Sequence, residues 1–415
     1  PLPRRVFQPQ RKNALGCNLE SLQALKSLSK AMQAQLPDAT NDQTETDSNL
    51  TPVRSPADDD EIVGYYRPVS RKDCLQACDQ SRQAFVSWRR VAVEERAALL
   101  EATAQLYEEH YPELMLLAMQ EAGKTLDNAL AEVREAVDFL RYYAHQARHL
   151  FDPKVLPSVT GEENRLQLEG KGPVLCISPW NFPLAIFTGQ VAAALAAGNT
   201  VLAKPSLLTP LIAQRAVALF HQAGVPPEVL QLVLAATREV EETLLQENAL
   251  RAVMFTGSTA VARKINRRLA LRDGPIIPLI AETGGQNAMI VDSSALTEQV
   301  VRDMVQSAFD SAGQRCSALR VLFVQEEVKA KTIATLSGHL EHLSLGDPLD
   351  WATDIGPVIS AGAQSELLLH IERFRQQGRV LYEAPLPPLR GHFVPPVIIE
   401  LEHINELYGE VFGPI

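Results

Sequence analysis

The chain has 415 residues, 46% of them hydrophobic and 21% charged, which is enough for two or three globular domains with substantial cores. A formal net charge of −11 argues against a nucleic-acid-binding surface, which needs clustered Lys and Arg side chains. The five cysteines form no C-x-x-C pair and indicate neither a disulfide framework nor a zinc site, so we expect no metal centre and a reducing, cytoplasmic location.

The first 60 residues predict a helical segment and a linker. A Pro/Arg-rich stretch is followed by an apolar helical face made of Leu22, Leu25, Leu28 and Met32. Residues 37–60 are rich in Asp, Thr, Asn, Ser and Pro, which favours a linker or mobile loop. We therefore expect residues 1–60 to precede the main fold. Because the chain begins with Pro1 rather than Met, we also expect it to be a piece of a longer polypeptide.

From residue 70 the pattern is helical, and after Leu150 strands and helices alternate. Residues 165–169 and 174–177 are separated by Gly-Lys-Gly and predict a hairpin or two neighbouring strands. Further strands, each followed by a helical pattern, are predicted at residues 200–203, 230–234 and 252–255. This order predicts a mostly parallel sheet covered by helices, the doubly wound α/β class, in which ligands bind outside the carboxyl ends of the strands.

Polar loops follow four of the predicted strands, at residues 178–183, 204–206, 256–259 and 282–285. The third of them would direct free backbone N–H groups and the positive end of a helix dipole toward a phosphate. The chain contains no G-x-G-x-x-G, so the usual dinucleotide-binding fingerprint is missing. Each loop taken singly is a weak indication of function.

Three side chains in these loops could serve a chemical function, and two of them, Lys204 and Glu282, also have a structural explanation. Lys204 offers a cation to a ribose or phosphate, or is an ordinary surface lysine. Asn181 lies in a proline-stiffened loop and could donate its amide to a developing oxyanion. Glu282 follows an apolar run, which predicts partly desolvated surroundings suited to a general base; the alternative is a turn or cap carboxylate.

A cysteine between a predicted helix and a predicted buried strand completes the set. The helical face consists of Val301, Met304, Val305 and Ala308, and the strand covers residues 320–324. Gly313 allows the chain to leave the helix, which places Cys316 on a loop of small residues where a substrate can approach the sulfur. A lone cysteine is more often a buried structural residue. The combination of thiol, amide, carboxylate and helix terminus is what favours a nucleophile.

Together these motifs resemble the aldehyde dehydrogenase superfamily over about residues 60–415. Six segments in the same order carry the resemblance: Ser178 to Pro183, Lys204 to Ser206, Phe255 to Ser258, Glu282 to Gly285, Phe309 to Cys316, and Glu410 to Pro414. The resemblance implies a doubly wound, Rossmann-like NAD-binding domain at residues 61–284. It also implies an α/β catalytic domain at residues 285–415 that is incomplete at its carboxyl end.

By this resemblance Cys316 attacks an aldehyde to form a thiohemiacetal, and Asn181 stabilises the oxyanion. Hydride then passes to NAD⁺, and Glu282 activates the water that hydrolyses the thioester. The residues implied in cofactor binding are Ser178, Pro179, Trp180, Lys204, Ser206, Gly257, Ser258, Glu410 and Phe412. Leu207 stands near the place where NAD-preferring relatives often carry a Glu, so the choice between NAD and NADP stays open.

A narrower resemblance is to the glutamate-semialdehyde (pyrroline-5-carboxylate) dehydrogenase half of bifunctional proline utilisation A proteins. It rests on residues 280–289, on residues 311–319 and on the opening residues 1–13, which look like the segment between the two enzymes of those proteins. It implies oxidation of L-glutamate γ-semialdehyde to L-glutamate, the second step of proline catabolism. The residues implied in substrate binding are Phe182, Arg315 and Ser317.

The same resemblance implies a homo-oligomeric parent protein, peripheral to the inner membrane, with an FAD-dependent proline dehydrogenase upstream in the same polypeptide. Family members continue beyond the position of Ile415, so we expect this fragment alone to be inactive. Two other functions remain open. One is oxidation of another carboxylated semialdehyde, such as succinate semialdehyde, and the other is a non-catalytic scaffold module that keeps the fold.

Overall fold

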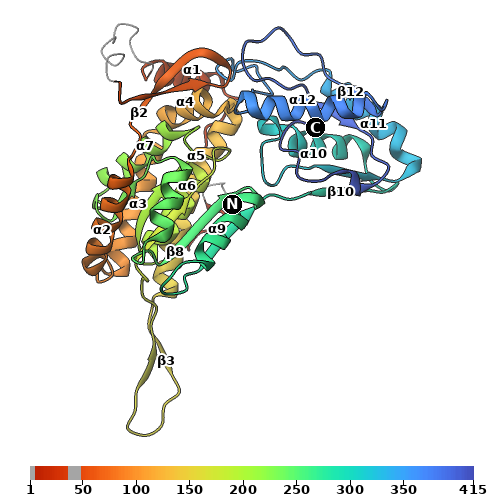
Figure 1. Ribbon diagram of the computed structural model, residues 1–415. Coiled ribbons are helices and arrows are strands. Elements are labelled where there is room, and N and C mark those ends of the chain that lie inside the picture. Colours follow the sequence, from red (N-terminus) through yellow and green to blue (C-terminus); the bar gives the residue numbers. More distant parts are fainter. Residues whose placement is uncertain (1–4, 36–47) are drawn as a thin grey trace. The chain divides into compact units, whose positions relative to one another are not determined.

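The computed structural model describes residues 5–35 and 48–415, and its contacts divide the chain into two compact units. Unit 1 comprises Pro1–Thr51, Tyr65–Leu116 and Leu130–Glu282. Unit 2 comprises Pro52–Gly64, Leu117–Ala129 and Thr283–Ile415. The two units alternate along the chain, because two short segments of the first third of the sequence belong to unit 2. Figure 1 shows the elements of both.

Unit 1 is built on a five-stranded sheet with the order β7-β6-β5-β8-β9. The strands are β5 (Pro173–Ile177), β6 (Thr200–Lys204), β7 (Leu230–Leu232), β8 (Ala252–Gly257) and β9 (Leu279–Thr283). β5 pairs in parallel with both β6 and β8, and β6 pairs in parallel with β7. Helices separate successive strands: α6 (Ala185–Ala196), α7 (Pro210–Gln222), α8 (Thr237–Glu242) followed by the turn η2 (Leu244–Gln246), and α9 (Thr259–Ala270). The predicted parallel, helix-covered sheet is confirmed.

The two faces of this sheet bury different helices. Leu175, Leu202 and Val253 occupy one register row across β5, β6 and β8, and all three are completely buried. They belong to a core cluster that includes side chains of α2 (Arg71–Trp88), α8 and α9. Because side chains alternate along a strand, the neighbouring positions point to the opposite face, where α6 packs on β5 and β6. Both faces are therefore apolar, as parallel sheets require.

Helix ends in unit 1 follow from local sequence. Ser70 and Asp73 form a capping box at the start of α2, with each side chain bonding the other residue's backbone N–H. Gly198 follows α6 with a φ of 77°, a left-handed conformation that glycine adopts without steric cost. α3 (Val93–Glu109), α4 (Tyr111–Ala122) and α5 (Leu126–Leu150) supply the helical pattern predicted from residue 70 onward.

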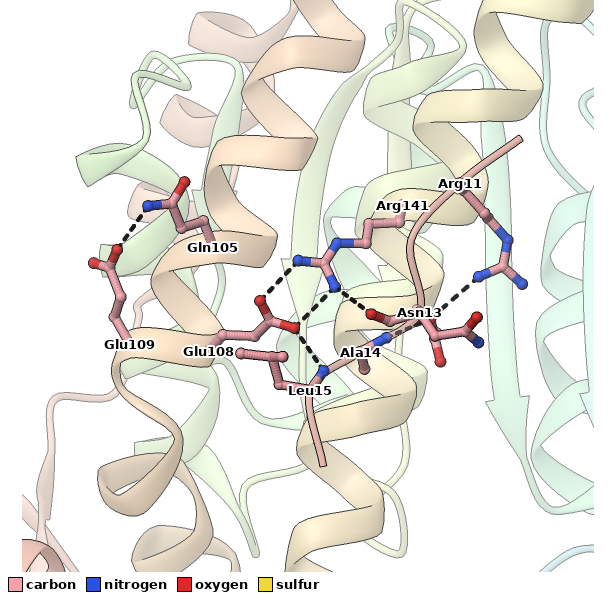
Figure 2. Close-up of polar contacts among 9 residues, drawn as sticks. Arg11, Asn13, Ala14, Leu15, Gln105, Glu108, Glu109 and Arg141 are labelled. Atoms are coloured by element: carbon pink, nitrogen blue, oxygen red, sulfur yellow. Dashed lines mark hydrogen bonds and ion pairs between the residues drawn. The ribbon is translucent and has the colours of Figure 1, made fainter. Parts of the chain in front are cut away.

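The amino-terminal segment lies against α3 and α5, as Figure 2 shows. Its helix α1 (Leu22–Gln33) is the one predicted from the apolar face. Ahead of it, the backbone N–H of Leu15 donates to Oε1 of Glu108 at 2.7 Å, and Arg141 makes two bonds with the same carboxylate at 2.8 Å each. Arg11 pairs with Asp138 at 3.1 Å. These contacts fix the segment on the surface of unit 1.

Two predictions about strands were wrong. Residues 51–60 were expected to lie in a linker, yet they form β1 (Thr51–Ser55) and the first residues of β2 (Asp58–Tyr66), and these two strands pair with each other. Backbone pairing does not depend on the polar side chains that suggested a linker, and the N–H of His392 also donates to the carbonyl of Pro56 at 2.9 Å. Most of the remaining expected linker, residues 36–47, lies outside the described residues.

The second wrong prediction concerns the hairpin expected between residues 165–169 and 174–177. β4 (Asn164–Leu166) pairs instead with β3 (Lys154–Leu156), in an antiparallel ladder. Figure 1 shows this hairpin projecting away from the helices of unit 1. β5 takes its partners from the central sheet. Such pairings join segments distant in sequence, so local alternation of polar and apolar residues cannot select them.

Besides most of β1 and β2, the described part of unit 2 contains two further short pairs of strands and three helices. β10 (Ala288–Val291) pairs in parallel with β11 (Val321–Val324), and β12 (Val380–Glu383) pairs antiparallel with β13 (Val397–Ile399). The helices are α10 (Thr297–Ala308), α11 (Glu326–Leu340) and α12 (Ala361–Arg375), with short turns η3 (Asp310–Gly313) and η4 (Ile404–Glu406). β11 was predicted as a buried strand but is buried only in part, since Phe323 is 47% exposed.

Candidate active site

The order of the sheet in unit 1 places a ligand-binding edge beside β5. The chain runs from β5 outward to β6 and β7, then returns to the other side of β5 as β8 and continues to β9. The connections after β5 and β8 therefore lead in opposite directions along the sheet, and sheets of this class bind ligands beside such a point, outside the carboxyl ends of the strands. Gln190 joins the two ends from α6, donating to the carbonyl of Ile177 at 3.3 Å and to Thr256 at 3.0 Å.

The loop after β5 carries the predicted amide donor. Ser178 donates its backbone N–H to the carbonyl of Lys204 at 3.1 Å, and its buried hydroxyl has no partner within the described structure. Pro179, Trp180 and Phe182 are half-buried and Asn181 is 6% exposed. The loop therefore presents one buried amide and one unsatisfied hydroxyl at the sheet edge.

Glu132 of α5 fixes the end of this loop, and its role was not predicted. Its Oε2 accepts from the backbone N–H groups of Leu184 at 3.1 Å and Ala185 at 2.9 Å, where α6 begins. A carboxylate at this point satisfies free N–H groups and complements the helix dipole. Glu132 precedes Asn181 by almost fifty positions, so no local sequence signal could have revealed it.

Lys204 ends β6 directly beside Ile177 of β5. It is 8% exposed rather than a surface lysine, and burial lowers the pKa of its ammonium group. An anionic or hydroxyl-bearing ligand at this edge would restore the solvation that burial removes. Ser206 follows, and its hydroxyl accepts from the backbone of Leu208 at 3.2 Å.

Gly257 and Ser258 form the junction between β8 and α9. A Cβ at Gly257 would lie 2.7 Å from the ring of Phe255, so only glycine fits there without a shift of the ring. Ser258 caps α9 by accepting from the N–H of Val261 at 3.3 Å. The exposed helix terminus, the buried Lys204 and the unpartnered Ser178 hydroxyl fit a phosphate-containing and ribose-containing cofactor such as a nicotinamide dinucleotide.

Glu282 differs from its prediction in one respect. It lies within β9 near the strand's carboxyl end, and it is exposed rather than partly desolvated. The apolar run before it forms an outer strand of the sheet, where burial is only partial. The carboxylate is therefore accessible to water.

Cys316 is the exposed cysteine of unit 2 and follows an unusual turn. Ser311, Ala312 and Gly313 have φ values of 58°, 53° and 67°, a run of left-handed conformations that costs energy at the two residues with a Cβ. Asn287 then holds the chain from the other side by donating to the carbonyls of Cys316 at 2.7 Å and Ala318 at 2.9 Å. We call residues 310–317 the Cys316 turn.

Buried polar contacts maintain this backbone. Nζ of Lys124 donates to the hydroxyl of Ser311 at 2.8 Å, and Asn128 donates to Asp310 at 2.6 Å. Arg315 also pairs with Asp310, at 3.1 Å. Gln314 is 4% exposed and bonds three backbone groups of the segments around it. Tertiary contacts thus offset the strain of the turn and leave the thiol exposed.

Gly313→Ala tests how strongly this turn is constrained. A Cβ at residue 313 would lie 2.1 Å from the carbonyl oxygen of Gly413, and the φ of 67° disfavours any other residue. We expect a loss of about 2–4 kcal/mol of unfolding free energy, measured by urea denaturation. Gly338→Ala in α11 is the matched control, because nothing lies within 4 Å of its Cβ, and it should stabilise by about 0.5–1 kcal/mol. Equal effects of the two substitutions would contradict the assignment.

A second turn of unit 2, residues 409–414, carries Glu410 and Phe412. Oε1 of Glu410 accepts from Arg320 at 3.1 Å, and burial raises the pKa of this carboxyl while the nearby guanidinium opposes that rise. A Cβ at Gly284 would lie 1.8 Å from Oε2 of Glu410, so any other residue at position 284 would displace the Glu410 carboxylate. We call residues 409–414 the Glu410 turn.

The structure distributes the candidate residues over both units. Unit 1 holds the loop of residues 178–183, Lys204, Ser206, the β8–α9 junction and Glu282 at the carboxyl ends of its strands. Unit 2 holds the thiol with Arg315 and the exposed Ser317, together with the Glu410 turn.

Within residues 5–35 and 48–415, no group of three His, Cys, Asp or Glu side chains could hold a metal ion. Over the same ranges, no helix is long and apolar enough to span a membrane.

An exposed thiol on a strained turn, and a doubly wound sheet with polar loops at its strand ends, are features of oxidoreductases of the aldehyde dehydrogenase type. A profile of the Aldehyde dehydrogenase family matches residues 43–415, and the chain belongs to this family. Members of the family generally use NAD(P). The fold class expected from the motifs is thereby confirmed.

Named relatives indicate which members of the family this chain resembles. The bifunctional protein PutA of Klebsiella aerogenes is 48% identical over 433 residues, which cover 100% of this chain and 32% of the relative. A 1-pyrroline-5-carboxylate dehydrogenase of Geobacillus thermodenitrificans is 34% identical over 375 residues, covering 89% of this chain and 73% of the relative. The chain therefore spans about a third of the PutA relatives that it matches and most of the shorter enzymes.

Solved structures that resemble this chain come from the same two kinds of protein. A variant of Bradyrhizobium japonicum proline utilization A superposes with a TM-score of 0.89 at 46% identity, over 100% of this chain and 39% of that chain. A variant of Thermus thermophilus 1-pyrroline-5-carboxylate dehydrogenase superposes with a TM-score of 0.90 at 28% identity, over 99% of this chain and 81% of that chain.

Proposed function

We propose that this chain carries an NAD⁺-dependent aldehyde dehydrogenase that oxidises L-glutamate γ-semialdehyde to L-glutamate. The observation that carries the proposal is the exposed Cys316 on a strained, well-supported turn, while Cys74, Cys78 and Cys176 are buried. In this proposal unit 1 binds the cofactor and unit 2 supplies the nucleophile. The names of the relatives that match most of their own length support the substrate.

The proposed chemistry begins at the sulfur. The Cys316 thiolate attacks the aldehyde carbon, and the carbonyl oxygen becomes an oxyanion that the Asn181 amide stabilises by roughly 3 kcal/mol. NAD⁺, when bound, supplies the acceptor for the hydride that leaves this carbon. Glu282 then takes a proton from water, the hydroxide attacks the thioester carbon, and the thiolate leaves as the acid forms. The exposed position of Glu282 suits this last step because its water must come from solvent.

Cofactor binding is assigned to the edge of unit 1 and to the Glu410 turn. Lys204 and Ser206 would face the adenosine ribose, and Gly257 and Ser258 the pyrophosphate. Glu410 would bond the nicotinamide ribose, with Phe412 beside the ring. We propose NAD⁺ as the preferred cofactor, and competition with NADP⁺ would test this, since Leu207 offers no carboxylate to repel a 2′-phosphate.

Substrate binding is assigned to the loops around the thiol. The exposed Ser317 would hold the substrate carboxylate, helped by Arg315, whose Nη1 is already paired with Asp310. Phe182 would border the aliphatic part. Succinate semialdehyde is the second candidate substrate because it also carries an aldehyde and a carboxylate, on a chain that is one carbon shorter and has no amino group.

The PutA relatives are described as bifunctional, which supports a parent protein with an FAD-dependent proline dehydrogenase in the same polypeptide. We propose that this parent is a cytoplasmic homo-oligomer that associates peripherally with the inner membrane. The free state of all five cysteines agrees with a reducing compartment.

The test is NAD⁺ reduction by the intact protein with aldehydes of different length. We expect kcat/KM for glutamate γ-semialdehyde to exceed that for succinate semialdehyde by about tenfold to a hundredfold or more, because succinate semialdehyde lacks one carbon of the chain together with its amino group. Propionaldehyde, which lacks the carboxylate, serves as the control and should react more slowly than either. A higher kcat/KM for succinate semialdehyde would replace the proposed substrate, and no reduction with any aldehyde would favour a non-catalytic scaffold.

A further inference from the structure

Arg320 is a buried arginine that the proposed reaction does not use directly. It lies just before β11, and its side chain is 2% exposed. Its Nη1 donates to the carbonyl oxygens of Gly313 at 2.6 Å and Gly413 at 3.3 Å. Its Nη2 donates to the carbonyl of Arg315 at 2.9 Å and to Oε1 of Glu410 at 3.1 Å. Each terminal nitrogen therefore bonds both the Cys316 turn and the Glu410 turn.

These contacts use the planar shape of the guanidinium group. The group also lies over the ring of Phe412, with its carbon 5.1 Å from the ring centroid, which adds a cation–π contact on the Glu410 side. A lysine carries one ammonium nitrogen and cannot reach all four acceptors in fixed directions. The two turns are also in direct contact, since a Cβ at Gly313 would overlap the carbonyl of Gly413. Arg320 thus locks together two segments almost a hundred residues apart in sequence.

We infer that Arg320 is a positioning residue that holds the Cys316 turn and the Glu410 turn in register for hydride transfer. The inference rests on the proposed function, in which the sulfur carries the hydride donor and Glu410 orients the acceptor ring. The rate of hydride transfer depends steeply on the distance between the donor carbon on the sulfur and the acceptor ring. A displacement of about 1 Å can lower this rate about a hundredfold. Charge supports the assignment, since Glu410 is the carboxylate that pairs with this buried guanidinium.

The experiment compares Arg320→Gln and Arg320→Lys with a matched control in the intact protein. The control is Arg379→Gln, because Arg379 also belongs to unit 2, pairs with a carboxylate, Glu406, and lies over an aromatic ring, Phe374, at 5.4 Å. We expect kcat to fall about a hundredfold in both Arg320 variants and less than threefold in the control. Thermal unfolding of all four proteins separates lost stability from lost positioning.

A second readout does not require turnover. Iodoacetamide alkylates the exposed Cys316, and the rate is measured with and without NAD⁺. In the wild type, we expect NAD⁺ to change the alkylation rate, because the cofactor contacts the Glu410 turn that Arg320 joins to the thiol. In Arg320→Gln this response should be lost, and it should persist in Arg379→Gln. If Arg320→Gln does not fold, Arg320→Lys, which keeps the buried charge, provides the comparison.

Three results would overturn the inference. The first is a wild-type kcat in Arg320→Gln, and the second is full activity in Arg320→Lys. The third is a loss of kcat that parallels the fall in unfolding temperature equally in the Arg320 variants and in the Arg379→Gln control. Failure of the proposed function looks different. In that case the wild type oxidises no aldehyde, while the alkylation rate without NAD⁺ still shows whether Arg320 holds the Cys316 turn, since it should change in Arg320→Gln and not in Arg379→Gln.

Discussion

Replacing Cys316 with Ala is expected to lower aldehyde oxidation by at least about a thousandfold, because no other side chain in unit 2 offers an exposed thiol within the described residues. Loss of a covalent nucleophile removes the whole acylation route rather than one of several stabilising contacts. NADH formation in the intact protein measures the effect. Thermal unfolding should change little, since Cys316 is exposed and substitutions at exposed positions have small effects on stability.

Cys17→Ala is the matched control for this experiment, since Cys17 is a half-buried thiol of unit 1 outside the proposed site. It should retain wild-type kcat. Chemical labelling gives an independent check. Iodoacetamide should modify Cys316 ahead of Cys78, because burial raises the pKa of the Cys78 thiol to about 11 and Cys78 is 2% exposed. Undiminished oxidation by Cys316→Ala would remove the thiol from the mechanism.

Replacing Glu282 with Gln should separate the two halves of the reaction. We expect a burst of about one NADH per active site, followed by steady turnover reduced about a hundredfold to ten-thousandfold. The amide keeps the shape of the carboxylate but cannot accept the proton of the attacking water. Hydride transfer precedes that step, so the burst remains while hydrolysis of the thioester becomes slow. Rapid-mixing measurement of NADH distinguishes the two phases.

Hydroxylamine extends the Glu282 test, because a strong nucleophile attacks a thioester without a general base. It should restore turnover in Glu282→Gln and leave Cys316→Ala inactive. Glu298→Gln, an exposed carboxylate on α10 paired with Lys331 at 3.6 Å, is the control and should behave as wild type. A Glu282→Gln protein that loses the burst as well would place Glu282 before the thioester and contradict its assigned role.

Much of unit 1 was predictable because its signals are local. The strands β5, β6 and β8 are short apolar runs that end at polar loops, and Ser258 caps α9 as a serine at a strand-to-helix junction should. In unit 2, the helix α10 likewise followed from its apolar face, and Gly313 marked the point where the chain leaves helical geometry. Each of these features depends on residues within one turn or one strand of each other.

Other features depended on contacts between distant segments. The pairing of β1 with β2 and of β3 with β4, the exposure of Glu282, and the cap that Glu132 places on α6 all follow from tertiary packing. Nor does any local pattern mark Arg320, since an arginine before a strand is ordinary until its four backbone and carboxylate partners are known.

The sequence by itself determined the class of fold and the family, because periodicity, turn chemistry and motif order depend on short stretches of chain, and it predicted which residues could react. Only the tertiary structure decided how Cys316 is presented. Two residues with φ near 55° are held there by Lys124, Gln314 and the backbone around them, and Arg320 then joins that turn to Glu410. A strained backbone persists only where contacts from other segments offset its cost. Contacts that keep this turn in place therefore come from outside the turn itself.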